Sequence, residues 1–225
     1  MYEDLKYWYL RDHKLFTTLN YSQIKQLCII TGFKKASKGE IIYFSTSDLP
    51  RIFLLKKGNI KIVAIDDEGN ETIKDIIQKG DLFGELTLET DTNSEEYAKV
   101  LSDDVSICSF LMADFENLLL SNPTLALSYT KLVGLKMKRT KNSYANLISK
   151  DAKTRLLLFL KDWAEKEGVR TANEVKLENY LTQTDIAQII CTSRQTATQL
   201  LNEMENNNLL LYSRKEIIIP DITKI

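Results

Sequence analysis

The sequence predicts an α+β protein with three parts: an N-terminal antiparallel β-roll, a long helix, and a C-terminal winged helix-turn-helix. Short apolar runs separated by turn residues fill the chain from Phe33 to Phe115. After Pro123 a long amphipathic stretch follows, and Thr182–Glu205 has the pattern of two short helices joined by a tight turn. These three observations divide the chain into residues 1–122, 123–150 and 151–225.

The first part is expected to begin with helix and continue as strands. Residues 1–30 have a helical pattern, and their apolar side chains for burial are Leu15, Leu19, Ile24, Leu27 and Cys28. The expected strands after them are Glu40–Phe44, Arg51–Lys56, Asn59–Ile65, Thr72–Ile77, Lys99–Leu101 and Val105–Leu111. Turn signals such as Lys57-Gly58 and Lys79-Gly80-Asp81 separate these runs, which is typical of an antiparallel roll or sandwich.

The second part is predicted to be one helix from Pro123 to about Ser149. Pro123 suits the first helical position, and Gly134 is the only glycine between Pro123 and Gly168. One apolar stripe recurs with alternating spacings of four and three residues; after Ala126 and Thr130 it comprises Val133, Met137, Thr140, Tyr144 and Leu147. Such a heptad seam favours pairing with a second copy of the chain, and the alternative is that the stripe packs on the chain's own roll.

The third part is expected to open with a helix from Ala152 to Glu167, capped by Asp151 and ended by Gly168. Thr182 with Asp185 forms a capping-box pattern for a helix over Gln183–Ile190. Ser193 is positioned to cap the next helix, whose apolar positions are Ala197, Leu200, Leu201 and Met204. Two apolar runs, Leu209–Tyr212 and Glu216–Ile219, then predict a hairpin that forms a wing.

The opposite side of the second short helix carries Arg194, Gln195, Thr198 and Gln199. Arg pairs with guanine and Gln with adenine through two hydrogen bonds each in the major groove of DNA. This side of the helix therefore indicates a DNA-reading surface, and the alternative is a surface helical hairpin with a polar face.

Composition excludes several classes of protein. The 225 residues are 44% hydrophobic and 27% charged, which is ordinary for a globular chain, and no apolar run is long enough to span a membrane. The charged and aromatic N-terminus predicts no signal peptide. Three well-separated cysteines without a Cys-x-x-Cys pattern favour a reduced, cytoplasmic protein. One histidine, no nucleophile elbow and no P-loop leave no catalytic residues to propose, and no metal-ligand motif occurs, so we expect neither an enzyme nor a metal protein.

The formal net charge of −1 hides a polarised chain. Residues 66–104 hold thirteen Asp or Glu against three Lys, a net of −10, whereas residues 131–155 hold eight Lys or Arg against one Asp, a net of +7. The basic segment precedes the helix-turn-helix, where contacts to DNA phosphates would be useful.

In this order, the motifs resemble the CRP/FNR (catabolite activator) family of bacterial transcription regulators over nearly the whole chain. HKLFTTL is similar to the family's opening helix; KGEIIYF, FLLKKGNIKI, DEGNET and KGDLFGEL are similar to its cyclic-nucleotide-binding roll. DAKTRLLLFL resembles the start of its DNA-binding domain, with Asp151 at the hinge position, and LTQTDIAQIICTSRQTATQLLNEMENNNLL resembles its helix-turn-helix.

The resemblance implies a homodimer joined along the long helix that reads inverted-repeat operators in double-stranded DNA and works with RNA polymerase. A kinase or channel subunit shares the roll, but that class leaves the winged C-terminus unexplained. By position in the family motif, Arg194, Gln195 and Gln199 face bases, while Ser193 and Thr196 meet phosphates. The expected DNA-binding set is therefore Ser193, Arg194, Gln195, Thr196, Thr198 and Gln199.

The expected effector pocket departs from the family's pattern. Cyclic-nucleotide-binding relatives carry an Arg-Ser/Thr-Ala triplet for the cyclic phosphate, whereas this chain has Glu96-Tyr97-Ala98, with Lys99 expected on the other face of its strand. The corresponding pocket set is Gly84, Glu85, Leu86, Glu96, Tyr97, Thr140 and Lys141. Lys141 stands where relatives have a small hydroxyl near the base. A carboxylate would repel the phosphate, so we do not expect cyclic AMP to be the effector.

Other sensing chemistries find little support in the sequence, and we expect no cofactor. Residues 1–27 hold no cysteine for an iron–sulfur cluster, His13 is expected at the surface, and Cys28 and Cys108 in the core. Cys191 replaces the glycine usual at the helix-turn-helix turn. The main prediction is a constitutive dimer or a relative with a closed pocket; the alternative is a regulator gated by another small molecule, haem or a redox signal.

Overall fold

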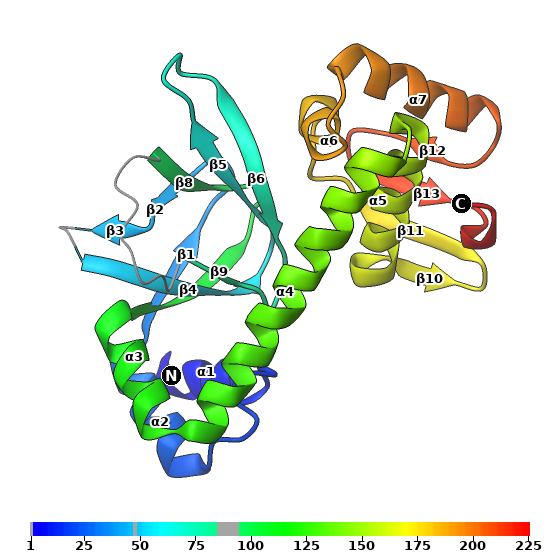
Figure 1. Ribbon diagram of the computed structural model, residues 1–225. Helices are drawn as coiled ribbons and strands as arrows, with labels where there is room; N and C mark the ends of the chain where they lie inside the picture. The colour runs from blue at the N-terminus through cyan, green and yellow to red at the C-terminus, as the bar shows by residue number, and fades with distance from the viewer. Residues whose placement is uncertain (1, 47–48, 85–94) are drawn as a thin grey trace. The chain divides into compact units, whose positions relative to one another are not determined.

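The computed structural model describes residues 2–46, 49–84 and 95–225 (Figure 1). The chain forms two compact units, residues 1–137 and 138–225, so the boundary between them falls inside the long helix. Within the described ranges, no helix is both long and apolar enough to cross a membrane.

The first unit contains the predicted β-roll, built from two antiparallel sheets. One sheet has the order β1-β9-β4-β3, with β7 paired to β4, and the other has the order β2-β8-β5-β6. The strands of the first sheet are β1 (Gly32–Ala36), β3 (Ser45–Thr46), β4 (Leu49–Lys57), β7 (Leu82–Phe83) and β9 (Val105–Leu111). Those of the second are β2 (Ile41–Tyr43), β5 (Ile60–Ile65), β6 (Glu71–Ile77) and β8 (Glu95–Val100). Each predicted strand is present, although β8 begins four residues before its expected start.

Three helices accompany the roll: α1 (Tyr2–Arg11), α2 (Tyr21–Ile30) and α3 (Met112–Ser121). The sequence did not predict α3 as a helix or β1 as a strand. The residue before α3 is Leu111, which makes no side-chain cap bond, so no start signal interrupts the apolar run of β9. These helices cover a buried cluster that includes Leu10, Phe16, Ile24, Phe110 and Phe115, and Leu15, Leu27 and Cys28 are buried as expected.

His13 is the clearest correction to the sequence-based expectations. We expected a surface position, but the imidazole is buried, with Nε2 2.8 Å from the carbonyl oxygen of Gly80 and Nδ1 accepting from the Leu15 amide. This arrangement makes Nε2 the donor to Gly80 and the ring neutral. Burial lowers the pKa of His13, although the bond to Gly80 opposes this effect. The partner lies 67 residues away in sequence, so no local pattern could reveal it.

The neutral, buried His13 should make stability depend on pH. The unfolded chain takes up a proton near the ordinary pKa of 6.5, whereas the folded chain does so only at a lower pH. The free energy of unfolding should therefore fall as pH drops from about 6.5 toward the folded pKa. Thermal unfolding of wild type and His13→Gln between about pH 7.5 and 5 checks this. We expect a shallower slope in the variant, and equal slopes would contradict a neutral buried imidazole.

The long helix α4 (Pro123–Ser149) begins and ends as predicted. Its first half rests on the roll unit: Leu125 is fully buried, the Tyr129 ring meets Phe115 edge-on with centroids 5.4 Å apart, and Lys136 pairs with Asp75 at 2.9 Å. This packing face lies beside the heptad seam rather than on it. Val133 and Met137, the seam residues at the end of this unit, are exposed.

The second unit contains the rest of α4, then α5 (Ala152–Glu167), α6 (Gln183–Ile189) and α7 (Arg194–Asn206), with a short 3-10 turn at Ile222–Lys224. Its sheet has the order β10-β11-β13-β12, with strands β10 (Val169–Thr171), β11 (Glu174–Glu178), β12 (Leu211–Tyr212) and β13 (Glu216–Ile219). β12 and β13 are the predicted hairpin, whereas β10 and β11 were not predicted. Gly168 caps the end of α5, and only glycine fits there because a Cβ would clash with the carbonyl oxygen of Ala164 and with Val175.

Candidate nucleic-acid interface

The two short helices of the C-terminal unit are fixed by local side-chain caps. Thr182 Oγ1 accepts from the Asp185 amide while Asp185 Oδ2 accepts from the Thr182 amide, which completes the predicted capping box. Ser193 Oγ accepts from the Thr196 amide at 3.0 Å and caps α7. Each cap stabilises its helix by about 1 kcal/mol, so both helices start where the sequence predicts.

The two sides of α7 differ as the apolar spacing predicts. Ala197, Leu201 and Met204 are buried against the rest of the unit. Arg194, Gln195 and Gln199 are exposed in the first two turns. In Figure 1, α7 (orange) runs along the outside of its unit, beside α6. The helix therefore presents three long hydrogen-bonding side chains on one accessible face.

Thr198, also expected at this face, is engaged with α6. Its hydroxyl lies 2.9 Å from Gln183 Oε1 and 2.9 Å from the Arg194 carbonyl oxygen. Because a hydroxyl carries a single hydrogen, these two acceptors share its one donor. Thr198 thus links α7 to Gln183, the first residue of α6. This bond fixes the side-chain amide of Gln183 at the start of that helix. The sequence did not predict this contact between Thr198 and Gln183.

Cys191 occupies the turn between α6 and α7 with φ of +50°. This left-handed conformation is the one expected from a position where glycine is usual, and it costs a non-glycine residue about 1–2 kcal/mol. The turn is held by backbone bonds from Cys191 to Gln188 and from Thr192 to Ala187. The thiol is exposed.

The wing places two further cations at the tip of its hairpin. Ser213 Oγ accepts from the Lys215 and Glu216 amides and shapes the turn between β12 and β13. Arg214 and Lys215 are exposed there. They stand in the turn that the sequence indicated, although they were not among the expected DNA contacts.

The basic segment 131–155 is only partly available to an outside phosphate. Lys136 pairs with Asp75, and Lys153 pairs with Glu203 of α7 at 2.5 Å. Arg155 donates to backbone carbonyls of its own unit. Fewer cations of this segment are therefore available to DNA phosphates than its net charge of +7 suggests.

In the roll, Tyr97 of the expected pocket set forms a polar group with Glu71 and Lys99. Tyr97 is buried on β8, and its hydroxyl donates to Glu71 Oε1 at 2.5 Å. Burial and this bond raise the pKa of Tyr97 to about 12. Lys99 points away from buried Ala98, as alternation predicts, and its ammonium lies 3.6 Å from the same Glu71 oxygen. Lys99, the cation nearest to Glu96-Tyr97-Ala98 in sequence, is thus already paired with a carboxylate.

The other expected pocket residues are distributed differently. Gly84 ends β7 with φ of +83°, and a Cβ there would lie 2.5 Å from the Arg51 carbonyl oxygen, so only glycine fits this turn. Glu96 lies on β8, half-buried, and Thr140 and Lys141 are exposed on α4. Glu85 and Leu86 lie outside the described residues.

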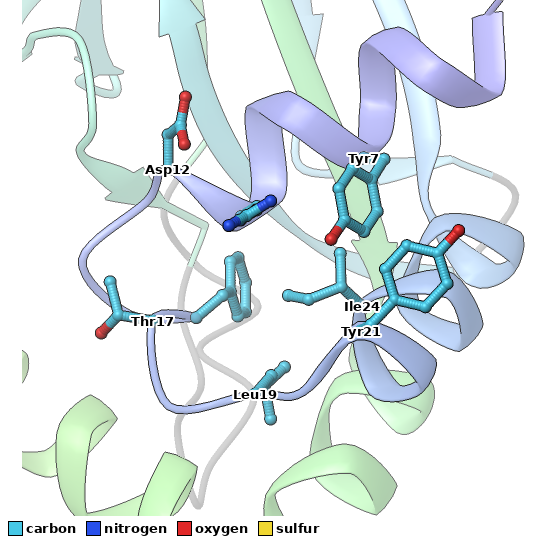
Figure 2. Close-up of a pocket in the computed structure, with 8 residues that line it drawn as sticks. Tyr7, Asp12, Thr17, Leu19, Tyr21 and Ile24 are labelled. Carbon is cyan, nitrogen blue, oxygen red and sulfur yellow. The ribbon is translucent and has the colours of Figure 1, made fainter.

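A separate hollow of about 600 Å³ lies at the N-terminal helices (Figure 2). Tyr7, Tyr21 and Ile24 stand close together at one side of it, and the Tyr7 and Tyr21 ring centroids are 5.2 Å apart. Asp12 and Thr17 are exposed at its rim. This hollow contains none of the expected effector-pocket residues, and its open rim distinguishes it from an enclosed ligand cavity. Among the described residues, no three His, Cys, Asp or Glu side chains gather to hold a metal ion.

The heptad seam of α4 is largely exposed in the single chain. The exposed fractions are 45% for Val133, 56% for Met137, 66% for Tyr144 and 38% for Leu147, and Thr140 is exposed between them. A stripe of large apolar side chains on a long helix is an unusual feature of a monomer's surface.

A β-roll followed by a long helix and a winged helix-turn-helix defines a DNA-binding transcription regulator. Residues 33–122 match the cyclic nucleotide-binding domain family, and residues 154–225 match the Crp-like helix-turn-helix domain family. In both of these domains the chain resembles the CRP/FNR family of transcription regulators.

Two curated relatives and one solved structure illustrate the similarity. The global nitrogen regulator of Synechocystis sp. is 25% identical over 183 residues, covering 81% of this chain and 81% of the relative. The CRP-like cAMP-activated global transcriptional regulator of Mycobacterium tuberculosis is 22% identical over 188 residues, covering 84% of each chain. The structure of a CooA mutant from Carboxydothermus hydrogenoformans is 25% identical, with a TM-score of 0.73 over 96% of this chain and 95% of that one. The family and these relatives are regulators of transcription rather than enzymes.

Proposed function

We propose that the protein acts as a homodimer that binds inverted-repeat operators in double-stranded DNA through α7. The observation that carries this proposal is the exposed face of α7, where Arg194, Gln195 and Gln199 follow a capped helix start. Arg and Gln are the side chains that read guanine and adenine through paired hydrogen bonds. Ser193 and Thr196 lie at the same end of the helix, where we place phosphate contacts.

The seam supports the dimer. Its side chains recur at a and d spacing along α4 and are exposed in the single chain. A symmetric pair of chains presents two copies of α7, and two copies read two half-sites related by the same twofold axis. In this proposal Asp151, which caps α5 through the Thr154 amide, marks the hinge between the dimer helix and the DNA-reading unit. Cytoplasmic location and contact with RNA polymerase complete the proposed role.

Selection from a pool of random duplex DNA tests the operator prediction. We expect the bound fraction to converge on an inverted repeat with half-site centres about 10 base pairs apart, because a helix-turn-helix dimer reads successive major grooves on one face of DNA. Footprinting of a selected duplex should protect both halves. Recovery of unrelated sequences after several rounds would contradict sequence-specific reading.

We further propose that cyclic AMP is not the effector of this chain. Tyr97 and Glu96 stand where relatives place the hydroxyl and the arginine, Tyr97 is committed to Glu71, and Lys99 pairs with the same carboxylate. A cyclic phosphate brought to this strand would meet acidic groups without the arginine that offsets its charge. The roll then serves as a scaffold or holds an uncharged or cationic ligand.

Calorimetry with cyclic AMP and cyclic GMP checks this proposal. No heat of binding is expected at concentrations of up to about 100 μM, since the phosphate would lack its charge-assisted partner. A cyclic-AMP-activated regulator serves as the positive control for the titrant. Micromolar binding of either nucleotide to this chain would contradict the proposal.

Haem is a weaker alternative, because the side chains that could bind its iron are already engaged or protonated. The Nε2 donor of His13 is used by Gly80 and Nδ1 accepts from Leu15, so the ring offers no free lone pair. Burial raises the pKa of the Cys108 thiol to about 11, which keeps it protonated at neutral pH. These contacts support a regulator without a haem at either residue.

A further inference from the structure

Arg155 links the turn before α7 to the residue after α4, because all three nitrogens of its guanidinium group donate hydrogen bonds. The side chain comes from the first turn of α5 and is half-buried. Nε donates to the Ile190 carbonyl at 2.8 Å, and Nη2 donates to the Cys191 carbonyl at 3.3 Å. Nη1 donates to the Lys150 carbonyl at 2.6 Å. Two of these acceptors lie in the turn of the helix-turn-helix, and the third lies directly after α4.

The chemistry of these contacts suits arginine alone. The last carbonyls of a helix have no partner within it, and the C-terminal end of α6 carries the negative end of the helix dipole. A planar guanidinium offers donors in fixed directions and bonds several carbonyls at once. A lysine ammonium at the same place would keep the charge but could not reproduce the planar set of donors.

The clamped turn also contains one of the three non-glycine residues that have a positive φ in the described part of the chain. Cys191 has φ of +50° without being glycine, so the turn needs outside contacts to hold its shape. The direction of α7 relative to α6 depends on that shape, and Arg194 follows the turn by only three residues.

We propose that Arg155 is a positioning residue for DNA recognition, which fixes the turn before α7 to the end of α4. This inference rests on the proposed reading of DNA by α7. It gives Arg155 a role different from a phosphate contact, which its place in the basic segment would otherwise suggest. The same contacts couple the hinge at Lys150-Asp151 to the turn. A change in the backbone at the hinge moves the Lys150 carbonyl, which is one of the three acceptors of Arg155.

The first test compares Arg155→Lys and Arg155→Met with Arg170→Met, which removes an exposed arginine from β10 of the same unit. Binding to a selected operator and to random duplex DNA is measured at several salt concentrations. We expect both Arg155 variants to lose about tenfold or more in operator affinity, because several charge-assisted bonds are lost. Affinity for random DNA and its salt slope should match those of Arg170→Met.

Two results would overturn the proposal. Wild-type operator affinity in Arg155→Lys would show that charge alone matters. An equal loss on operator and random DNA, with the salt slope of Arg155→Met lowered by about one, would make Arg155 a phosphate contact.

Hydrogen exchange tests the clamp without DNA, and therefore separates its failure from failure of the proposed function. The amides of Cys191 and Thr192, which donate to Gln188 and Ala187, should exchange faster in Arg155→Lys than in wild type. The amide of Gly168 at the far end of α5 is the internal control. Unchanged exchange at the turn would contradict the clamp even if operator binding is confirmed.

A second substitution keeps the idea testable if the Arg155 variants are unstable. Cys191→Gly lets the turn adopt its left-handed φ at little cost, so it should recover part of the operator affinity lost in Arg155→Lys. No recovery would contradict a role for Arg155 in holding this turn.

Discussion

Replacing Met137 with glutamate should convert the dimer into monomers and weaken operator binding by more than about 100-fold. Met137 occupies an a position of the seam and is 56% exposed in the single chain. In a symmetric pair the two copies of this position face each other, so the variant would place two carboxylates together in a desolvated interface. A monomer binds each half-site separately and loses the gain from linking two recognition helices. Analytical ultracentrifugation and fluorescence anisotropy measure the two effects.

Asn142→Glu is the matched control, because residue 142 is exposed on the side of α4 opposite the seam. It adds the same charge to the same helix and should leave the dimer intact. A Met137→Glu protein that still sediments as a dimer would contradict the proposed seam.

Replacing Arg194 with alanine should weaken binding by about 1–3 kcal/mol per half-site and relax the preference at one base pair of each half. Arg194 is exposed at the first position of α7, where a side chain reaches the floor of the major groove. The loss is therefore expected only on operators that carry the preferred base. Binding of wild type and Arg194→Ala to duplexes with each base pair at that position measures it.

Arg170→Ala controls for the change in net charge, because it removes an arginine from β10, outside α7. A uniform loss on every duplex, with a reduced salt slope, would identify Arg194 as a phosphate contact instead.

The parts of the fold that the sequence predicted are those with local signals. Asp151, Thr182 and Ser193 each cap a helix through an amide three residues on, so residue type and spacing suffice to place those helix starts. The left-handed φ of Cys191 agrees with the glycine that the family resemblance places at this turn.

The parts that the sequence missed depend on partners far along the chain. His13 is buried by Gly80, Arg155 is held by Ile190 and Cys191, and β1 is a strand because it pairs with β9. No pattern within a window of sequence contains such pairs. Tyr97 is a similar case. Its position in the motif could be identified from the sequence, but its hydrogen bond to Glu71 could not.

The spacing of half-sites tests the central claim most directly, because it depends on both the seam and α7. Anisotropy titrations should compare a selected inverted repeat with the same duplex lengthened by about five base pairs between its halves, which turns them to opposite faces of DNA. We predict two chains on the intact repeat and, on the lengthened duplex, affinity close to that of a single half-site. Equal affinity for the two duplexes would contradict a symmetric dimer that reads both halves at once.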